Sequence, residues 1–202
     1  MKNQIIDYFN EIIPNPKCEL DYNKDYELLL AVMLSAQTTD KRVNTVTKVL
    51  FSKYNTLEEL SNSDIYDIKN IIKSIGTYNK KASNVITIAN KLKEIGYVPN
   101  DRLLLESLPG VGRKTANVVL GILYDEEVIA VDTHVNRVAK RLGLADISDS
   151  VLEVEKKLTK HFKDSNLVKV HHQMILFGRY YCKAKKPLCS NCKLKNICKH
   201  SI

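Results

Sequence analysis

The sequence lacks any long apolar run. Its longest uninterrupted stretch of apolar residues, 28–34, has seven residues, whereas a helix needs about 20 apolar residues to cross a bilayer. The N-terminal segment is interrupted by Asp7 and Glu11, so it does not contain the apolar centre of a signal peptide. We therefore expect a soluble, intracellular protein with no membrane partner.

The sequence also lacks strand-like alternation, low-complexity linkers and fixed-period repeats. Apolar residues recur instead at helical spacing, which predicts an all-α protein with about ten short helices. The run 28–34 is apolar on all sides and predicts a central buried helix. The helical stripes are Ile5, Ile6, Phe9, Ile12 and Ile13; Val43, Val46, Val49 and Leu50; Ile65, Ile68, Ile71, Ile72 and Ile75; and Ala82, Val85, Ile86, Ala89 and Leu92.

Helix boundaries are marked as well. Thr56 with Glu59 has the spacing of a capping box at a helix start. Three glycines stand where helices are expected to end, since glycine adopts the left-handed conformation that closes many helices. They are Gly76, Gly96 and Gly143.

The charge of the chain favours a polyanionic partner. Lys and Arg number 31 against 23 Asp and Glu, a formal net charge of +8, although charge alone is weak support for nucleic-acid binding. The segment 183–199 has six lysines and no acidic residue. Because cysteines are interleaved with these lysines, a bound metal would make the segment a rigid basic surface.

Four cysteines near the C-terminus form a C-x6-C-x2-C-x5-C pattern within seventeen residues: Cys182, Cys189, Cys192 and Cys198. Thiolates this close indicate a metal site, and a disulfide framework does not suit a helical chain that is not secreted. Spacing alone leaves zinc and an iron–sulfur cluster in competition. One C-x2-C pair flanked by wider loops can enclose a cubane, so we favour [4Fe–4S] over zinc.

The segment LPGVGRKTANVVL, residues 108–120, contains a proline-glycine hairpin with Lys114 in the first turn of an expected helix. The backbone N–H groups of such a hairpin can bind a phosphate. Asp132 follows Lys114 by eighteen residues, at the start of a second expected helix, 133–142. A buried-looking lysine amine paired with a carboxylate suits covalent attack on a carbon that carries a leaving group.

The chain can bring these two residues together. A helix over 113–123 would span about 16 Å, and an extended segment 124–131 would reach back about 26 Å. Considered separately, Lys114 is best interpreted as a phosphate-binding lysine and Asp132 as a helix N-cap. The combination favours chemistry on nucleic acid.

Together these motifs resemble the endonuclease III family, bifunctional base-excision DNA glycosylases of the helix-hairpin-helix superfamily. The resemblance covers Tyr26–Cys198 and rests on LPGVGRKTANVVL, VDTHVNRV, LLAVMLSAQTTD, IGTYNKKA and the cysteine spacing. It implies an all-α, two-lobed helix-hairpin-helix DNA glycosylase fold with a C-terminal iron–sulfur cluster loop. A six-helix barrel domain that contains the hairpin would cover 18–126, and residues 1–17 with 127–202 would form the iron–sulfur cluster domain.

The resemblance also implies roles for individual residues. Lys114 and Asp132 match the family's catalytic pair, and the four cysteines match its [4Fe–4S] ligands. Gln37 matches a glutamine that fills the space of an extruded base, whereas Thr77 stands where the family usually has a bulky apolar wedge. The residues expected to contact DNA are Gln37, Thr77, Leu108, Gly110, Gly112, Arg113, Lys185 and Lys186.

The implied activity is removal of oxidised pyrimidines through a lysine Schiff base, followed by cleavage of the strand by β-elimination. The expected partner is double-stranded DNA that carries oxidised pyrimidines or abasic sites. The protein would act as a monomer in the cytoplasm, associated with the nucleoid if the source is prokaryotic.

Three other functions compete with this interpretation. The adenine-mismatch glycosylase lacks the hairpin lysine and has a glutamate where Ala31 stands, and the 8-oxoguanine glycosylase generally lacks the cysteine cluster. The third is a non-catalytic DNA-binding module with a zinc site, and only the pairing of Lys114 with Asp132 argues against it.

His171 and His172 lie in the expected helix before the cysteines. Histidines at such a place more often pack or form hydrogen bonds than bind a metal.

Overall fold

The structure is a computed structural model that describes residues 1–200. These residues form eleven α-helices, one π-helical segment and two 3-10 segments, with no strand among them. The prediction of an all-α protein is therefore confirmed. None of the helices within the described residues combines the length and the apolar character needed to cross a bilayer.

The chain folds into two compact units. The first, the hairpin unit, is Cys18–Tyr124, and the second, the cysteine unit, is Met1–Lys17 with the chain from Asp125 onward. The hairpin unit contains α2 (Asp25–Leu34), α3 (Asp40–Lys53), α4 (Leu57–Ser61), α5 (Ile65–Ile72), α6 (Tyr78–Ile95), α7 (Arg102–Glu106) and α8 (Arg113–Tyr124). The cysteine unit contains α1 (Lys2–Ile12), α9 (Thr133–Arg141), α10 (Val151–His161), α11 (Leu167–Leu176), the π-helix η1 (Phe177–Tyr181) and the 3-10 helices η2 (Cys189–Asn191) and η3 (Lys195–Ile197).

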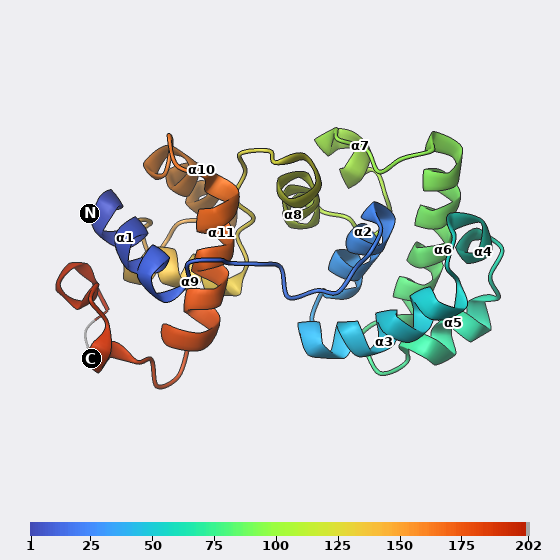
Figure 1. Ribbon diagram of the computed structural model, residues 1–202, viewed down its shortest axis with the longest axis horizontal. Helices are drawn as coiled ribbons and strands as arrows, with labels where there is room; N and C mark the ends of the chain where they lie inside the picture. Colours follow the sequence, from blue (N-terminus) through green and yellow to red (C-terminus); the bar gives the residue numbers. More distant parts are fainter. Residues whose placement is uncertain (201–202) are drawn as a thin grey trace. The chain divides into compact units, whose positions relative to one another are not determined.

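The hairpin unit is organised around α2 and α6. Every residue of α2 from Leu28 to Leu34 is buried, as its all-round apolar sequence predicts. The longest helix, α6, has eighteen residues and contacts α2, α4 and α5. Figure 1 shows α6, in green, alongside α4 and α5.

The predicted helix boundaries are mostly confirmed. The Thr56 side chain accepts the amide of Glu59, and the Glu59 carboxylate accepts the amide of Thr56, which completes the capping box. Gly96 ends α6 with a φ of 87°, and Gly143, which follows α9, has a φ of 70°. Gly76 does not end a helix, because α5 already stops at Ile72 and a turn separates the two residues.

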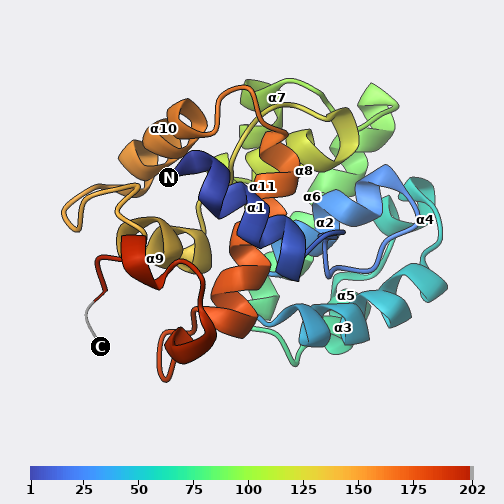
Figure 2. The same ribbon diagram turned by 60° about the vertical axis from the view of Figure 1, so that its left-hand side comes forward.

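The cysteine unit packs α11 against α1 and α9. Figure 2 shows α1, in blue, lying across α11, in orange. Aromatic rings join these helices to η1, since the ring centroids of Phe9 and Phe177 lie 5.1 Å apart. The apolar stripe predicted for the N-terminal helix is therefore part of a core formed from both ends of the chain.

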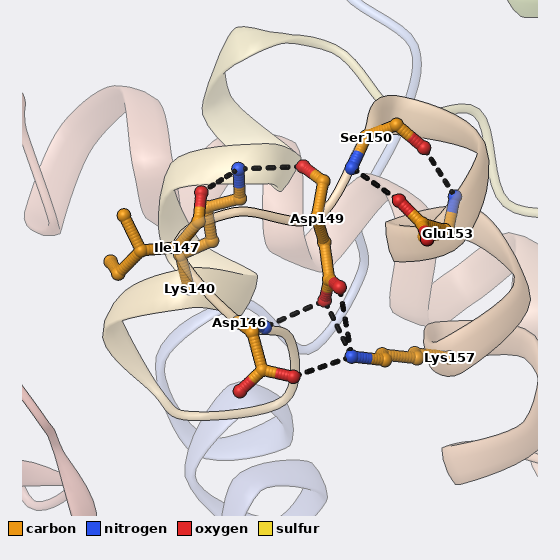
Figure 3. Close-up of polar contacts among 7 residues, drawn as sticks. All are labelled: Lys140, Asp146, Ile147, Asp149, Ser150, Glu153 and Lys157. Atoms are coloured by element: carbon orange, nitrogen blue, oxygen red, sulfur yellow. Dashed lines mark hydrogen bonds and ion pairs between the residues drawn. The ribbon is translucent and has the colours of Figure 1, made fainter.

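The connection between α9 and α10 is held by an ionic network (Figure 3). Lys157 donates to Asp146 at 2.6 Å and to Oδ2 of Asp149 at 2.7 Å. These carboxylates raise the pKa of Lys157, and Lys157 in turn lowers the pKa of Asp149. Lys140, in the last turn of α9, donates to the carbonyls of Ile147 and Asp149, both at 2.9 Å. The C-terminal end of α9 is thereby fixed to the start of α10.

Candidate active site

The hairpin between α7 and α8 contains a glycine with no room for a side chain. Gly110 has a left-handed φ of 80°, and the amide of Val111 donates to the carbonyl of Leu108 at 3.1 Å. A Cβ atom on Gly110 would lie 2.5 Å from Nδ2 of Asn84 on α6 and 3.3 Å from Cγ of Met33 on α2. The tip of the hairpin therefore rests directly against two helices of its unit.

The other hairpin residues divide between core and surface. Leu108 is buried, so only its backbone is available to a ligand. Gly112 and Arg113 are exposed, and a Cβ on Gly112 would meet no atom within 4 Å. Since the first N–H groups of an α-helix have no acceptor within the helix, the exposed start of α8 offers backbone donors to an anion.

Lys114 lies in the first turn of α8, and its side chain is exposed. The expectation of a buried lysine is therefore wrong. The start of α8 is exposed from Gly112 to Lys114, whereas its buried residues begin at Ala116. The buried face of α8 consists of Ala116, Asn117, Val119, Leu120 and Gly121. The amine of Lys114 is accessible to a large substrate.

Asp132 is the N-cap of α9. Its Oδ1 accepts the amides of His134 and Val135, both at 2.8 Å, as the N-cap interpretation of the sequence predicted. A carboxylate is also favoured at this end of a helix by the helix dipole. Asp132 belongs to the cysteine unit, whereas Lys114 belongs to the hairpin unit.

Gln37 and Thr77 lie on two neighbouring loops of the hairpin unit. Both are exposed, and both have a left-handed backbone, with φ of 57° and 55°. This conformation is rare for a residue with a Cβ and most unusual for a β-branched residue such as threonine. The loops are close together, since a Cβ on Gly76 would lie 3.8 Å from the carbonyl oxygen of Gln37.

Lys81 is a buried lysine that sequence reasoning missed. Its side chain is 4% exposed, and burial lowers its pKa. The ammonium donates to the carbonyl of Leu34 at 2.9 Å, to the carbonyl of Ala36 at 2.7 Å and to Oγ1 of Thr38 at 3.4 Å. Lys81 precedes Val85 by four residues, so it falls on the apolar face of α6, and this spacing was the available signal of its burial.

The four clustered cysteines line one cavity of about 290 Å³. Burial raises the pKa of the Cys189 and Cys192 thiols, and the neighbouring cysteines raise it further. The structure thus brings the four predicted ligands to one place. Within residues 1–200, no three His, Cys, Asp or Glu side chains converge as ligands of a single metal ion would.

Two arginines of α9, which the sequence analysis did not identify, bind the segment around Cys182, the first cysteine of the cluster. Arg137 donates to the carbonyl of Gly178 at 2.7 Å and to the carbonyl of Cys182 at 3.1 Å. Arg141 donates to the carbonyl of Lys183 at 2.7 Å and to Sγ of Cys182 at 3.4 Å. These acceptors lie 41 to 45 positions away along the chain, so no local pattern could indicate them.

The remaining predicted residues are found in the cysteine unit. Lys185 and Lys186 are exposed, and Lys186 has a left-handed φ of 51°. His171 and His172 are buried in α11, with ring centroids 5.0 Å apart, and burial lowers the pKa of His172. Their position agrees with the packing role expected for them.

Known proteins resemble this chain over nearly its whole length. Residues 30–164 match the family model of HhH-GPD superfamily base excision DNA repair proteins. Endonuclease III of Bacillus subtilis (strain 168) is 46% identical over 196 residues, 96% of this chain and 90% of that protein. Endonuclease III of Rickettsia felis is 49% identical over 201 residues, 98% of this chain and 93% of that protein. The solved structure of a trapped endonuclease III–DNA covalent intermediate, an estranged-adenine complex, has a TM-score of 0.92 at 47% identity, and the match covers 98% of this chain and 96% of that one.

Gly110→Ala should lower the free energy of unfolding by about 1–3 kcal/mol, because overpacking costs that much and the left-handed φ adds strain. Gly112→Ala is the matched control. Its Cβ meets open space, so this variant avoids the overpacking and should lose only the smaller amount by which alanine is a poorer N-cap than glycine. The added methyl group at the exposed start of α8 should also weaken binding to DNA. Thermal unfolding and fluorescence anisotropy with duplex DNA measure the two effects. Equal melting temperatures for the variants would contradict the packing of Gly110.

Proposed function

The chain belongs to the HhH-GPD superfamily of base excision DNA repair proteins and, within it, to the endonuclease III family, and we propose that it removes oxidised pyrimidines from duplex DNA and then cleaves the abasic strand. The proposal is carried by Lys114, an exposed amine directly after the hairpin. An amine at this place can form a bond with DNA whose phosphates the hairpin binds. The relative that was trapped in a covalent intermediate with DNA supports this chemistry.

The reaction begins with attack by Nζ of Lys114 on C1′ of the damaged nucleotide. The bond from C1′ to the base breaks, and the base leaves with the bonding electrons. Loss of a proton from the nitrogen and opening of the sugar ring give a Schiff base between lysine and sugar. The Schiff base acidifies the hydrogen on C2′, and removal of that hydrogen expels the 3′ phosphate. The strand is thus broken on the 3′ side of the lesion by β-elimination.

Asp132 is the second group that the reaction requires. Its carboxylate accepts the proton of the Lys114 ammonium or stabilises the positive charge that develops on the sugar, and either role needs a negative charge. Two amides of α9 bind its Oδ1 and so restrict the orientation of the carboxylate. The N-cap role is therefore compatible with catalysis and prepares the group for it.

The remaining residues of the proposal bind and open the DNA. An enzyme that acts on a base must first extrude it from the duplex. We assign to Gln37 the space that the base leaves, and to Thr77 the stack beside it, since both are exposed on loops. The proposed phosphate contacts are Arg113, Lys185, Lys186 and the backbone of Leu108, Gly110 and Gly112.

The four cysteines would hold a [4Fe–4S] cluster. Thiolates are the ligands that such clusters use, and all four cysteines line one cavity of about 290 Å³. Cys182 receives a hydrogen bond at Sγ from Arg141, the kind of outer contact that orients a metal ligand. When bound, the cluster supplies a covalent crosslink that fixes the basic segment 183–199.

The enzyme would act as a monomer on the DNA of the cytoplasm or nucleoid. One chain supplies the hairpin, both loops and the basic segment, so the reaction does not need a second copy. The net charge of +8 favours encounter with a polyanion.

Borohydride should reduce the Schiff base and crosslink the protein to DNA that carries a thymine glycol or an abasic site. Lys114→Ala should reduce the crosslink to background, because no amine remains to attack. Lys91→Ala removes an exposed lysine of α6 and should leave the yield unchanged. Denaturing electrophoresis measures the yield, and crosslinking that persists in Lys114→Ala would refute the assignment.

Asp132→Asn should keep the stability and DNA affinity of the protein, since asparagine caps helices as well as aspartate does. The single-turnover rate should fall by about 10²–10⁴-fold, because the negative charge is lost. Asp132→Ala is the control, since it should lose about 1 kcal/mol of stability together with the rate. An unchanged rate in Asp132→Asn would leave Asp132 as a helix cap only.

The purified protein should be brown, with four irons per chain and broad visible charge-transfer absorption. Cys192→Ser should lose most of this iron, whereas Cys18→Ser, which changes the cysteine outside the cluster pattern, should retain it. Metal analysis that returns one zinc and no iron would overturn the cluster assignment.

A further inference from the structure

Lys81 contacts both loops that carry the proposed base-opening residues. Its side chain binds the first loop on either side of Gln37, through the carbonyl of Ala36 at 2.7 Å and Oγ1 of Thr38 at 3.4 Å. Its backbone amide donates to the carbonyl of Thr77 at 3.1 Å, which closes the first turn of α6. One residue therefore spans the two loops.

The ammonium group is suited to this position. An ammonium has three N–H donors, and Lys81 has three acceptors, the third being the carbonyl of Leu34 at 2.9 Å. This carbonyl is the last one of α2, so it receives no hydrogen bond from within the helix. A positive charge is also favoured at a helix C-terminus. Burial of a charge is costly unless it is hydrogen-bonded, so these contacts account for a lysine in the interior.

The two loops need such support because their conformations are strained. Gln37 and Thr77 both have left-handed backbones, and residues held in this way persist only when their surroundings determine the conformation. Without the ammonium, the carbonyls of Leu34 and Ala36 lose a donor, and the loop of Gln37 is free to relax.

We propose that Lys81 is a positioning residue that sets the spacing between Gln37 and Thr77 and thereby determines how efficiently the enzyme extrudes a paired base. Lys81 is buried and does not itself reach DNA. This inference rests on the proposed function, since it assumes that Gln37 and Thr77 enter the duplex. If the inference is correct, base extrusion depends on Lys81. Cleavage of the strand at a site that has already lost its base does not depend on Lys81.

Two substrates separate these steps: a duplex with one thymine glycol paired with adenine, and the same duplex with a preformed abasic site. Lys81→Met keeps the length of the side chain but removes the charge and the donors. Its single-turnover rate should fall at least tenfold on thymine glycol and stay within twofold of the original on the abasic site. Lys91→Met, which removes an exposed lysine from the same helix, should match the original protein on both substrates.

A second measurement follows extrusion without chemistry. In a Lys114→Ala background, 2-aminopurine opposite the lesion should brighten on binding, and Lys81→Met should reduce the amplitude at saturating protein. If Lys81→Met does not fold, Lys81→Gln, which retains two N–H donors, provides the same comparison with a smaller loss.

Equal losses on the two substrates, or no loss on either, would overturn the positioning role. A different outcome concerns the proposed function: if the original protein cleaves neither substrate and forms no borohydride crosslink, the enzymatic assignment itself fails. The two failures are therefore distinguishable.

Discussion

The burial of α2 is the constraint on which the hairpin unit depends. Its apolar run, 28–34, has no polar face, so this helix is stable only in the interior, where every residue of the run is buried. Met33 then stands beside Gly110 at the tip of the hairpin. Lys81 binds the carbonyl of Leu34, which ends the helix, and the carbonyl of Ala36 in the loop that follows. One buried helix thus determines the position of the hairpin that precedes Lys114 and of the loop that follows the helix.

In the cysteine unit the corresponding element is α9, which begins at Asp132. Gly178 allows η1 to approach this helix closely, because a Cβ there would lie 2.9 Å from the Cβ of His134. Arg141, at the other end of α9, binds the Cys182 segment. The proposed catalytic carboxylate and the proposed cluster are therefore supported by the same helix, and a bound cluster would stabilise both.

Local patterns in the sequence predicted the helices, because the burial of an apolar stripe repeats every turn and the Thr56 capping box is complete within four residues. The hairpin and the grouping of the four cysteines could likewise be predicted, since each depends on residues within one short segment. The burial of Lys114 was predicted wrongly, because whether other segments cover the first turn of α8 is a tertiary property. The spacing of Lys81 to Val85 indicated its burial, but nothing local indicated its acceptors or those of Arg137, which are carbonyls 41 to 47 positions away.

Backbone strain gives a separate indication of the residues proposed to contact DNA. Five non-glycine residues in the described part of the chain have a left-handed φ: Gln37, Thr77, Asp125, Asp164 and Lys186. Aspartate adopts this conformation at little cost, so two of the five need no further explanation. For glutamine, threonine and lysine it costs about 1–3 kcal/mol, and such strain concentrates at functional sites. All three are proposed DNA contacts: Gln37 and Thr77 from the family resemblance, and Lys186 from the basic segment 183–199. Backbone strain and the sequence therefore point to the same three residues.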